Sequence, residues 1–137
     1  MTRFMITLEQ GVNLVWYAFE GMVGGEIYVK NIPSMKVTDI ARAVAPDVRQ
    51  DIVGVRPGEK LHEQMIGFED ALYTCEYKDY CKILPAIYKW SEDPERINGG
   101  GEVAPDFTYC LNSNVDWMSL ETLRDWIRQS RDKLGKL

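Results

Sequence analysis

The strongest chemical signal in the sequence is a short segment rich in turn-forming and charged residues. Residues Arg56–Lys60 read Arg-Pro-Gly-Glu-Lys and directly follow the β-branched run Asp51–Val55. The run predicts a strand, and the Pro-Gly pair predicts a turn that opens a helix reaching about Ile66. An arginine beside the free amides of a helix N-terminus could hold phosphate oxygens, and Glu59 could accept hydrogen bonds from hydroxyls. On the residues alone, a capped surface turn with a solvated arginine explains the segment better than an anion site does.

Two more residues could take part in chemistry: His62, close to this segment, and Arg3, near the N-terminus. His62 is the only histidine and could serve as a general base near neutral pH. No serine or cysteine is placed by the sequence to pair with it, so a structural or exposed histidine is the preferred interpretation. Arg3 is either a second cation facing a phosphate or a surface residue, and both interpretations stay open.

Motifs that would carry a cofactor or a metal are missing from the sequence. No Gly-x-Gly-x-x-Gly segment follows a strand, and the run Gly99–Gly101 precedes no predicted helix. No tyrosine is followed by a lysine four residues later, the spacing that short-chain dehydrogenases use for acid–base chemistry. The cysteines Cys75, Cys81 and Cys110 match no zinc spacing. We therefore expect this chain to bind no cofactor and no metal, and to contain no catalytic residue.

The elements that must position these residues are read from periodicity and from capping signals. Apolar residues at three- and four-residue steps predict a helix over Thr7–Met22, with a capping box formed by Thr7 and Gln10. The other expected elements are an extended segment at Thr2–Ile6, a strand at Gly25–Val29, a helix at Val37–Val44, a hairpin over Tyr73–Pro85 that turns at Lys78-Asp79, a loop-rich stretch at 88–105 and a last helix from Ser119. The fold class is mixed α and β, in a single domain over residues 1–137.

Composition limits the classes of function. With 45% hydrophobic and 27% charged residues, the 137-residue chain has the composition of a folded protein. The net charge of −5 argues against binding to nucleic acid, which needs a basic surface. No segment is apolar over the roughly 20 residues of a membrane span. Three cysteines, an odd number, fit reduced thiols, so we expect a soluble cytoplasmic protein without nucleic-acid or membrane partners.

Several segments together carry a resemblance to a known family. Met1–Val12 resembles a segment well inside extended short-chain dehydrogenases/reductases. Ile32–Lys36, which reads Ile-Pro-Ser-Met-Lys, followed by Gly54–Glu63, narrows the resemblance to UDP-N-acetylglucosamine 4,6-dehydratases of the soluble type that inverts carbon 5. Ala104–Tyr109 and the closing helix resemble the C-terminal end of the same enzymes. The similarity is collinear and covers nearly the whole chain.

The resemblance implies a function and a set of contacts. In that family an NADP-dependent enzyme removes a hydride from carbon 4 of the sugar, eliminates water across carbons 5 and 6, and returns the hydride to carbon 6. The product, a 4-keto-6-deoxy sugar nucleotide, serves surface glycan biosynthesis. By resemblance, Arg56 is expected to bind the UDP diphosphate, Glu59 to support the nucleotide or its ribose, and Arg3 to lie near the nucleotide. The remaining two residues expected at the substrate, or shaping its loop, are Lys36 and Ser34.

The sequence also departs from the family pattern. The cofactor loop and the Tyr-x-x-x-Lys pair of these enzymes have no counterpart in the 137 residues, so NADP is expected in the parent enzyme and not in this chain. The expected fold is the C-terminal substrate-binding lobe of an extended short-chain dehydrogenase/reductase, without the N-terminal Rossmann half. The chain would bind a UDP-sugar but be inactive alone. The alternative is a non-enzymatic assembly module that associates with itself, as a homo-oligomer, or with a separate NADP-binding half, through exposed apolar surface.

Overall fold

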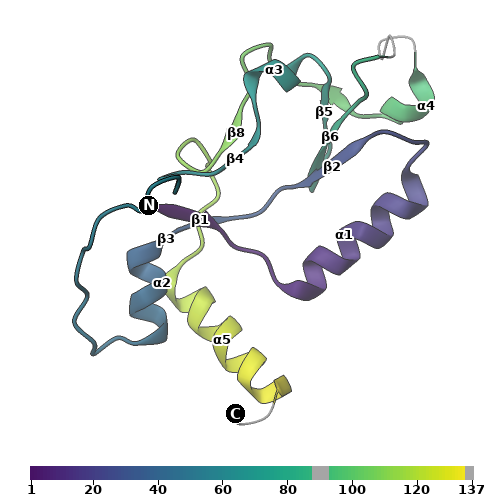
Figure 1. The fold of residues 1–137 in the computed structure, drawn as a ribbon. Helices are drawn as coiled ribbons and strands as arrows, with labels where there is room; N and C mark the ends of the chain where they lie inside the picture. Colours follow the sequence, from purple (N-terminus) through teal and green to yellow (C-terminus); the bar gives the residue numbers. More distant parts are fainter. Residues whose placement is uncertain (88–92, 135–137) are drawn as a thin grey trace.

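The structure, a computed structural model, describes residues 1–87 and 93–134 and contains three small antiparallel sheets (Figure 1). One sheet pairs β1 with β3, a second has the strand order β2-β6-β5-β7, and the third pairs β4 with β8. The strands are β1 (Thr2–Phe4), β2 (Ile27–Lys30), β3 (Ser34–Lys36), β4 (Gln64–Ile66), β5 (Thr74–Glu76), β6 (Tyr80–Ile83), β7 (Gly101–Glu102) and β8 (Tyr109–Cys110). The helices are α1 (Leu8–Gly21), α2 (Val37–Val44), α3 (Phe68–Ala71), α4 (Pro94–Ile97) and α5 (Leu120–Leu134).

Local capping signals position the helices where the sequence predicts them. At the start of α1 the Thr7 hydroxyl accepts a hydrogen bond from the Gln10 amide at 3.1 Å, and the Gln10 side chain accepts one from the Thr7 amide at 3.0 Å. This reciprocal pair is the predicted capping box. At the start of α5 the Ser119 hydroxyl accepts a hydrogen bond from the Thr122 amide at 3.0 Å. The range of α2 also agrees with the prediction.

The predicted hairpin is present and forms the centre of the four-stranded sheet. Strands β5 and β6 pair with Thr74 opposite Ile83, and the Tyr77 amide donates to the Tyr80 carbonyl at 2.9 Å. Lys78-Asp79 therefore make the turn, as predicted. On the other side of β6, β2 pairs along its whole length. In the part of the chain that the structure describes, β2 has no second neighbour and is the edge of this sheet.

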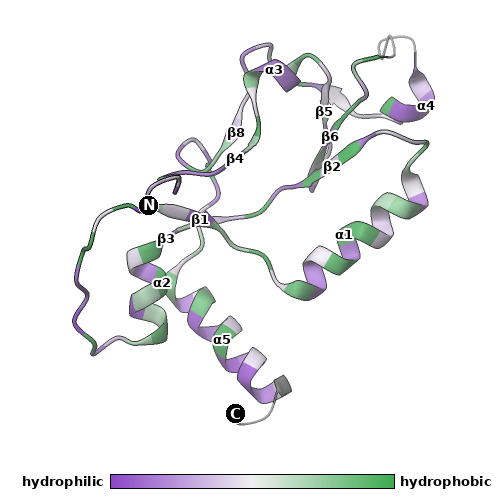
Figure 2. Ribbon diagram, in the orientation of Figure 1, coloured by the Kyte–Doolittle hydropathy of each residue, from purple (hydrophilic) through white to green (hydrophobic). Residues whose placement is uncertain are grey.

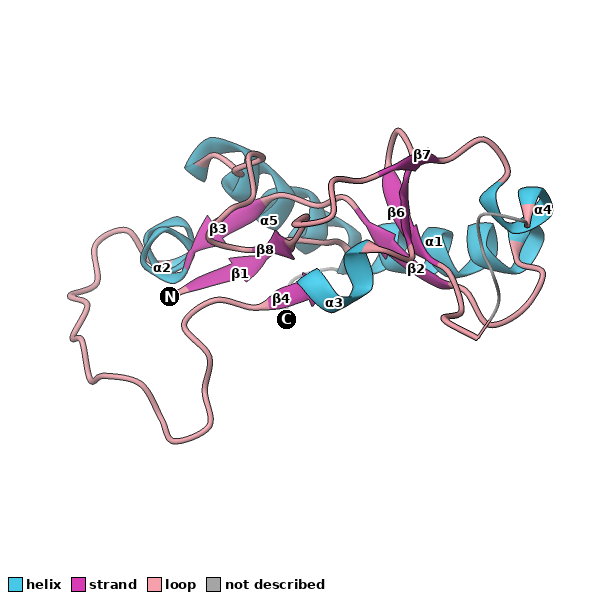
Figure 3. Ribbon diagram, turned by 90° about the horizontal axis from the view of Figure 1, so that it is seen from above, coloured by secondary structure: helices cyan, strands magenta, loops and turns pink. Residues whose placement is uncertain are grey.

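Two predictions about the middle of the chain are wrong. Residues 51–55 form no strand but belong to a long loop between α2 and β4, which extends away from the rest of the molecule in both views (Figures 1 and 3). Ile52 and Val53 are almost completely exposed there. A β-branched run stabilises a strand only through cross-strand and packing partners, and this loop supplies none. Residues 64–66, predicted as the end of a helix, are instead β4, which pairs with β8.

The stretch predicted as loop contains two short elements. Helix α4 begins after Asp93, whose side chain accepts a hydrogen bond from the Arg96 amide at 3.1 Å. Strand β7 then pairs with β5, opposite Cys75. The prediction of loop structure is therefore corrected for these two segments, and its residues 88–92 lie outside the described residues.

The buried side chains form two separate clusters. One lies between the four-stranded sheet and the β4-β8 pair, and the other holds α2 and α5 against β3. The first cluster comprises Val29, Ile66, Cys81, Ile83 and Tyr109. The second comprises Met35, Met118 and Leu123, with partly buried residues of α2 and α5 around them. The segment 31–36 connects the two clusters, because β2 contributes Val29 to the first cluster and β3, three residues further on, contributes Met35 to the second.

Tyr109 fixes that connecting segment. Its hydroxyl donates to the Ile32 carbonyl at 2.9 Å and accepts from the Ile32 amide at 2.9 Å, in a buried site. Burial raises the pKa of the Tyr109 hydroxyl, so the phenol stays neutral and can act as donor and acceptor together. The Ile32 carbonyl accepts a further bond from the Asn114 amide group at 2.9 Å.

Replacing Tyr109 by phenylalanine should therefore destabilise the fold. Tyr109→Phe leaves the buried Ile32 amide without its acceptor, which we expect to lower the free energy of unfolding by about 1–3 kcal/mol in urea denaturation. Tyr73→Phe, a hydroxyl deletion on a partly buried tyrosine packed against the same cluster, is the matched control and should cost less. An equal loss in both variants would contradict a specific role for the Ile32 bonds.

Candidate functional site

The Arg56 segment forms the predicted turn but not the predicted helix. The Glu59 amide donates to the Arg56 carbonyl at 3.0 Å, and Gly58 adopts a positive φ of 82°. Proline at the second position and glycine at the third are the residues that a type II turn requires. No helix follows, because residues 59–63 contain neither a helix nor a strand. Positive charge at this site therefore comes from arginine side chains and not from a helix N-terminus.

Tertiary structure brings Arg3 to this turn. Its guanidinium lies 3.4 Å from the Glu59 carboxylate and donates to the carbonyls of Thr2 at 2.6 Å and Lys60 at 3.3 Å. The other Glu59 oxygen accepts a hydrogen bond from the Arg56 amide at 3.3 Å. Glu59 thus links the Arg3 guanidinium to the backbone of Arg56, two residues that lie far apart in the sequence. All three side chains remain accessible to solvent, with exposed fractions of 30% for Arg3 and 34% for Glu59.

The end of the loop is attached to β1 next to this pair. The Thr2 amide donates to the Leu61 carbonyl at 3.0 Å, and the Thr2 hydroxyl shares a hydrogen bond of 2.7 Å with Nδ1 of His62. Thr2 is buried and His62 is exposed, so their bond is partly shielded from water. His62 is exposed and tied to β1, which agrees with the structural interpretation of this histidine.

Ser34 and Lys36 lie on the neighbouring strand but face away from Arg3. In the antiparallel pairing, Lys36 is opposite Thr2 and Ser34 is opposite Phe4, whereas Arg3 is opposite Met35. Side chains alternate between faces along a strand, so Ser34 and Lys36 belong to the face that Arg3 does not share.

Ser34 has a structural role in its loop. It is completely buried, and its hydroxyl accepts a hydrogen bond from the Asn114 amide group at 2.8 Å. Its backbone bonds to Asp116 and Met118. The hydroxyl therefore holds the segment that leads into α5, which fits the expectation that Ser34 shapes its loop, and a contact of Ser34 with a substrate stays a prediction. Lys36 is exposed, and a contact of Lys36 with a ligand stays a prediction.

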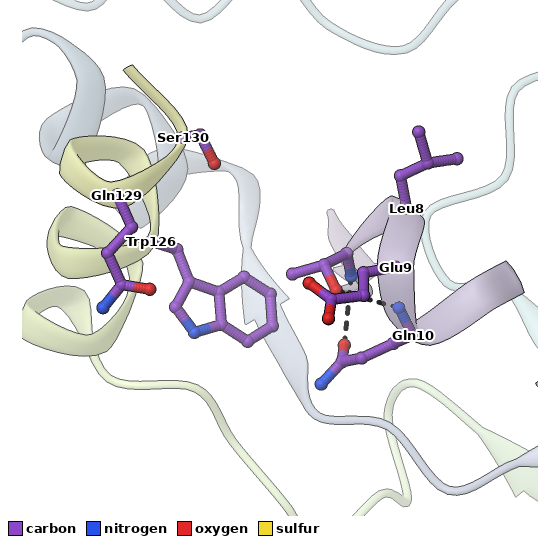
Figure 4. A pocket seen from close by; sticks show the side chains of 7 residues that line it. Leu8, Glu9, Gln10, Trp126, Gln129 and Ser130 are labelled. Carbon is purple, nitrogen blue, oxygen red and sulfur yellow. Dashed lines mark hydrogen bonds between the residues drawn. The ribbon is translucent and has the colours of Figure 1, made fainter. Parts of the chain in front are cut away.

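Sequence reasoning missed a pocket between the start of α1 and α5. Its volume is about 410 Å³, and the Trp126 indole faces Gln10 and Glu9 across it (Figure 4). A neighbouring pocket of about 370 Å³ shares Gln10 and Trp126 and adds Lys30. Both lie away from Arg3 and Glu59. Because the first pocket has no cationic lining residue, the Arg3 and Arg56 side chains remain the better anion site.

A second group missed from the sequence is a tyrosine cluster on the sheet face toward α1. Tyr77 and Tyr80 are stacked with ring centroids 4.5 Å apart, and the buried Lys82 ammonium lies 5.2 Å from the rings of Tyr28 and Tyr77. Burial raises the pKa of Tyr77 to about 12 and lowers the pKa of Lys82. A phenol that acts as an acid–base catalyst near neutral pH needs the opposite shift, which argues against such a role for Tyr77.

Comparison with known proteins identifies the family. The model of the polysaccharide biosynthesis protein family matches residues 1–85, more than half of the chain. The chain belongs to this family. Two inverting UDP-N-acetylglucosamine 4,6-dehydratases of Campylobacter jejuni are 43% and 44% identical to the chain over 135 residues, which is 95% of the chain. A UDP-glucose 4-epimerase of Rickettsia canadensis is 36% identical over 92 residues, 61% of the chain and 26% of the epimerase. The resemblance to the dehydratases is thereby confirmed.

A solved structure supports the fold class. The X-ray structure of Pen from Bacillus thuringiensis matches 96% of this chain with a TM-score of 0.76 and 23% sequence identity, and the match covers 38% of the Pen chain. The chain likewise spans 40% of the length of the two Campylobacter jejuni relatives. The predicted class, a mixed α/β fold that corresponds to part of an extended short-chain dehydrogenase/reductase, is confirmed.

Residues 1–87 and 93–134 lack two features that would indicate other functions. No helix in these ranges is both long and apolar enough to cross a lipid bilayer. In the same ranges, no three histidine, cysteine, aspartate or glutamate side chains come together as a possible metal site.

If Glu59 serves a ligand and not the fold, its loss should leave stability nearly unchanged. Glu59→Gln removes a partly exposed ion pair, for which we expect a change of less than about 1 kcal/mol in the free energy of unfolding. Urea denaturation at moderate salt measures this change, with Arg42→Gln, which removes another exposed pair, as control. A loss above about 2 kcal/mol would mean that the pair is mainly structural.

Proposed function

We propose that the chain supplies the nucleotide-sugar binding surface of a 4,6-dehydratase that acts on UDP-N-acetylglucosamine for surface glycan biosynthesis. The single observation that supports this most is the meeting of Arg3, Glu59 and the Arg56 turn on one accessible surface. The similarity to the Campylobacter jejuni dehydratases supplies the chemical class of the ligand.

The charges at the turn suit a diphosphate. An arginine fork binds phosphate oxygens through two parallel hydrogen bonds, and two arginines on one surface can each take one phosphate. Glu59 holds the Arg3 guanidinium at 3.4 Å, a distance that a more highly charged diphosphate can compete with. The carboxylate would then be free to accept hydrogen bonds from ribose hydroxyls. Glu59 orients Arg3 before binding and contacts the nucleoside after it.

We infer that NADP, which the dehydratase reaction needs, is held outside residues 1–87 and 93–134. A dinucleotide is held by a glycine-rich turn between a strand and the start of a helix. Gly24 and Gly25, both with positive φ, instead follow the end of α1, and Gly99 and Gly100 lead into β7. The chain would therefore bind and orient the UDP part of the substrate, and the oxidation and elimination require groups from another part of the enzyme.

An assembly module is the second candidate function. The exposure of apolar side chains on α1, namely Leu8, Trp16 and Phe19, favours it. Such a module would associate without regard to nucleotide, so the effect of UDP on the molecular mass in light scattering separates the two functions.

The arginines provide the direct test. Calorimetric titration of the wild-type chain with UDP should show weak binding, and Arg56→Ala should weaken it by about ten- to a hundred-fold, the cost of one or two charge-assisted hydrogen bonds. Arg3→Ala should act in the same direction. Arg49→Ala, an exposed arginine of the same loop paired with Asp51, is the matched control and should leave the affinity unchanged. An absence of heat with the wild-type chain at millimolar UDP would overturn an autonomous site.

The backbone of the turn gives a second test. Gly58→Ala forces an L-residue into the left-handed region and should weaken UDP binding by about five- to ten-fold, the equivalent of about 1 kcal/mol of strain. Gly54→Ala is the matched control, because Gly54 has a similar φ of 88° in the same loop, and nothing lies near a Cβ at either position. Equal effects of the two variants on UDP affinity would show that loop strain in general, and not the Arg56 turn, controls binding.

A further inference from the structure

The last part of the long loop, residues 59–62, contacts both faces of β1. Side chains alternate between the two faces of a strand, so Thr2 and Arg3 point in opposite directions. The Arg3 guanidinium lies 3.4 Å from the Glu59 carboxylate on one face, and the Thr2 hydroxyl lies 2.7 Å from Nδ1 of His62 on the other. The chain between Glu59 and His62 therefore passes along the edge of β1. We call residues 59–62 the loop end.

Backbone hydrogen bonds attach the loop end between these two side-chain contacts. The Thr2 amide donates to the Leu61 carbonyl at 3.0 Å, and the Arg3 guanidinium donates to the Lys60 carbonyl at 3.3 Å. Strand β1 is itself paired with β3. Figure 2 shows hydrophilic residues, in purple, along much of the loop that precedes the loop end, where no helix or strand is present. The loop end is thus the part of the loop that is attached to regular structure.

The position of Arg56 depends on the loop end. The Glu59 amide donates to the Arg56 carbonyl at 3.0 Å, and the Arg56 amide donates to the Glu59 carboxylate at 3.3 Å. These two bonds attach the turn to Glu59, and Glu59 is attached to β1 as part of the loop end. A displacement of the loop end would therefore move Arg56 relative to Arg3.

The Thr2–His62 hydrogen bond differs from the Arg3–Glu59 ion pair in two ways. The Thr2 end of the bond is buried, with 5% of the residue exposed, whereas the side chains of the ion pair are 30% and 34% exposed. Loss of the bond leaves a buried hydroxyl without its partner, whereas a partly exposed ion pair contributes little to stability. An anion that takes Arg3 away from Glu59 also breaks the ion pair, but it leaves the Thr2–His62 bond in place.

We propose that Thr2 and His62 are positioning residues, whose hydrogen bond keeps the Arg56 turn beside Arg3 when a diphosphate displaces the Glu59 carboxylate. This role rests on the proposed function and adds to it the residues that maintain the site in the bound state. The Thr2 hydroxyl and the imidazole lie on the face of β1 opposite Arg3, so they do not touch the ligand. They act through the backbone of the loop end.

Trypsin measures the attachment of the loop end without any ligand. Cleavage requires a segment to leave its backbone hydrogen bonds, and its rate follows the population of the opened segment. Lys60 is exposed, so protection of the bond after it comes from the backbone. Arg49, in the same loop but outside the loop end, supplies an internal reference. Thr2→Val removes the hydroxyl and keeps the branched shape. It should raise the initial rate of cleavage after Lys60, relative to cleavage after Arg49, by about three- to ten-fold, the weight of one neutral hydrogen bond.

Calorimetric titration with UDP measures the consequence for the site. Thr2→Val and His62→Gln should each raise the dissociation constant by about three- to ten-fold. Thr2→Ser and His62→Asn should stay near the wild type, because serine keeps the hydroxyl and an asparagine amide occupies the position of Nδ1, whereas a glutamine amide occupies that of Nε2. Thr74→Val is the matched control. It removes another buried hydroxyl, which donates to the Asp70 carbonyl at 2.8 Å, and should change neither the cleavage ratio nor the affinity.

Three results would overturn the proposal. These are a wild-type cleavage ratio in Thr2→Val, an equal loss of UDP affinity in His62→Asn and His62→Gln, and an effect of Thr74→Val as large as that of Thr2→Val. Raised cleavage after Lys60 with unchanged UDP affinity would refute the positioning role and leave the proposed function in place. If the wild-type chain binds no UDP, the proposed function fails, and the cleavage ratios still decide whether the Thr2–His62 bond holds the loop end.

Discussion

The hydrogen bonds of Thr2 and Arg3 to residues 59–62 hold a long loop that has no regular structure of its own. The Thr2 amide and hydroxyl bind Leu61 and His62, and the Arg3 guanidinium binds the Lys60 carbonyl and the Glu59 carboxylate. The same strand, β1, also pairs with β3, which is buried against α5. One three-residue strand thus joins the packed part of the molecule to the candidate site.

This arrangement explains how an exposed loop can present charges in a defined geometry. A solvated arginine usually loses side-chain entropy when it binds a ligand, which offsets part of the gain. Glu59 and two backbone carbonyls already restrain Arg3, and the Pro-Gly turn restrains the backbone of Arg56. Preorganisation of this kind lowers the cost of binding an anion even without a helix dipole. The burial of Thr2 beside the pair strengthens the restraint, since water competes less for its bonds than for those of an exposed residue.

The helices of the molecule differ in how much of their apolar surface is buried. The β4-β8 pair and the α2-α5 pair bury their apolar residues in the two clusters, whereas α1 buries none of its stripe. The exposure of α1 agrees with the length of the similar proteins. The chain matches about two fifths of each, and in such a protein the remaining residues can cover an apolar surface of the matched part.

Features that depend on neighbours in the sequence were predictable. The capping box at Thr7, the turn at Lys78-Asp79 and the Pro57-Gly58 turn each involve residues at most a few positions apart, so their energetics are encoded locally. The family could also be predicted from the sequence, since the order of the motifs along the chain indicates it. The site could be predicted only as separate residues: Arg3 and Arg56 were named, but nothing in the sequence placed Glu59 between them.

Pairing and burial were decided by tertiary structure alone. Residues 51–55 have strand propensity but no partner, whereas residues 64–66 became a strand because β8 lies beside them. The sequence named Ser34 but did not place it inside the molecule, where the segment before α5 encloses it. The sequence by itself determined that α1 has an apolar stripe, because periodicity fixes which side chains share a face. Only the tertiary structure decided that this face points outward, because the direction of a face depends on where the rest of the chain packs.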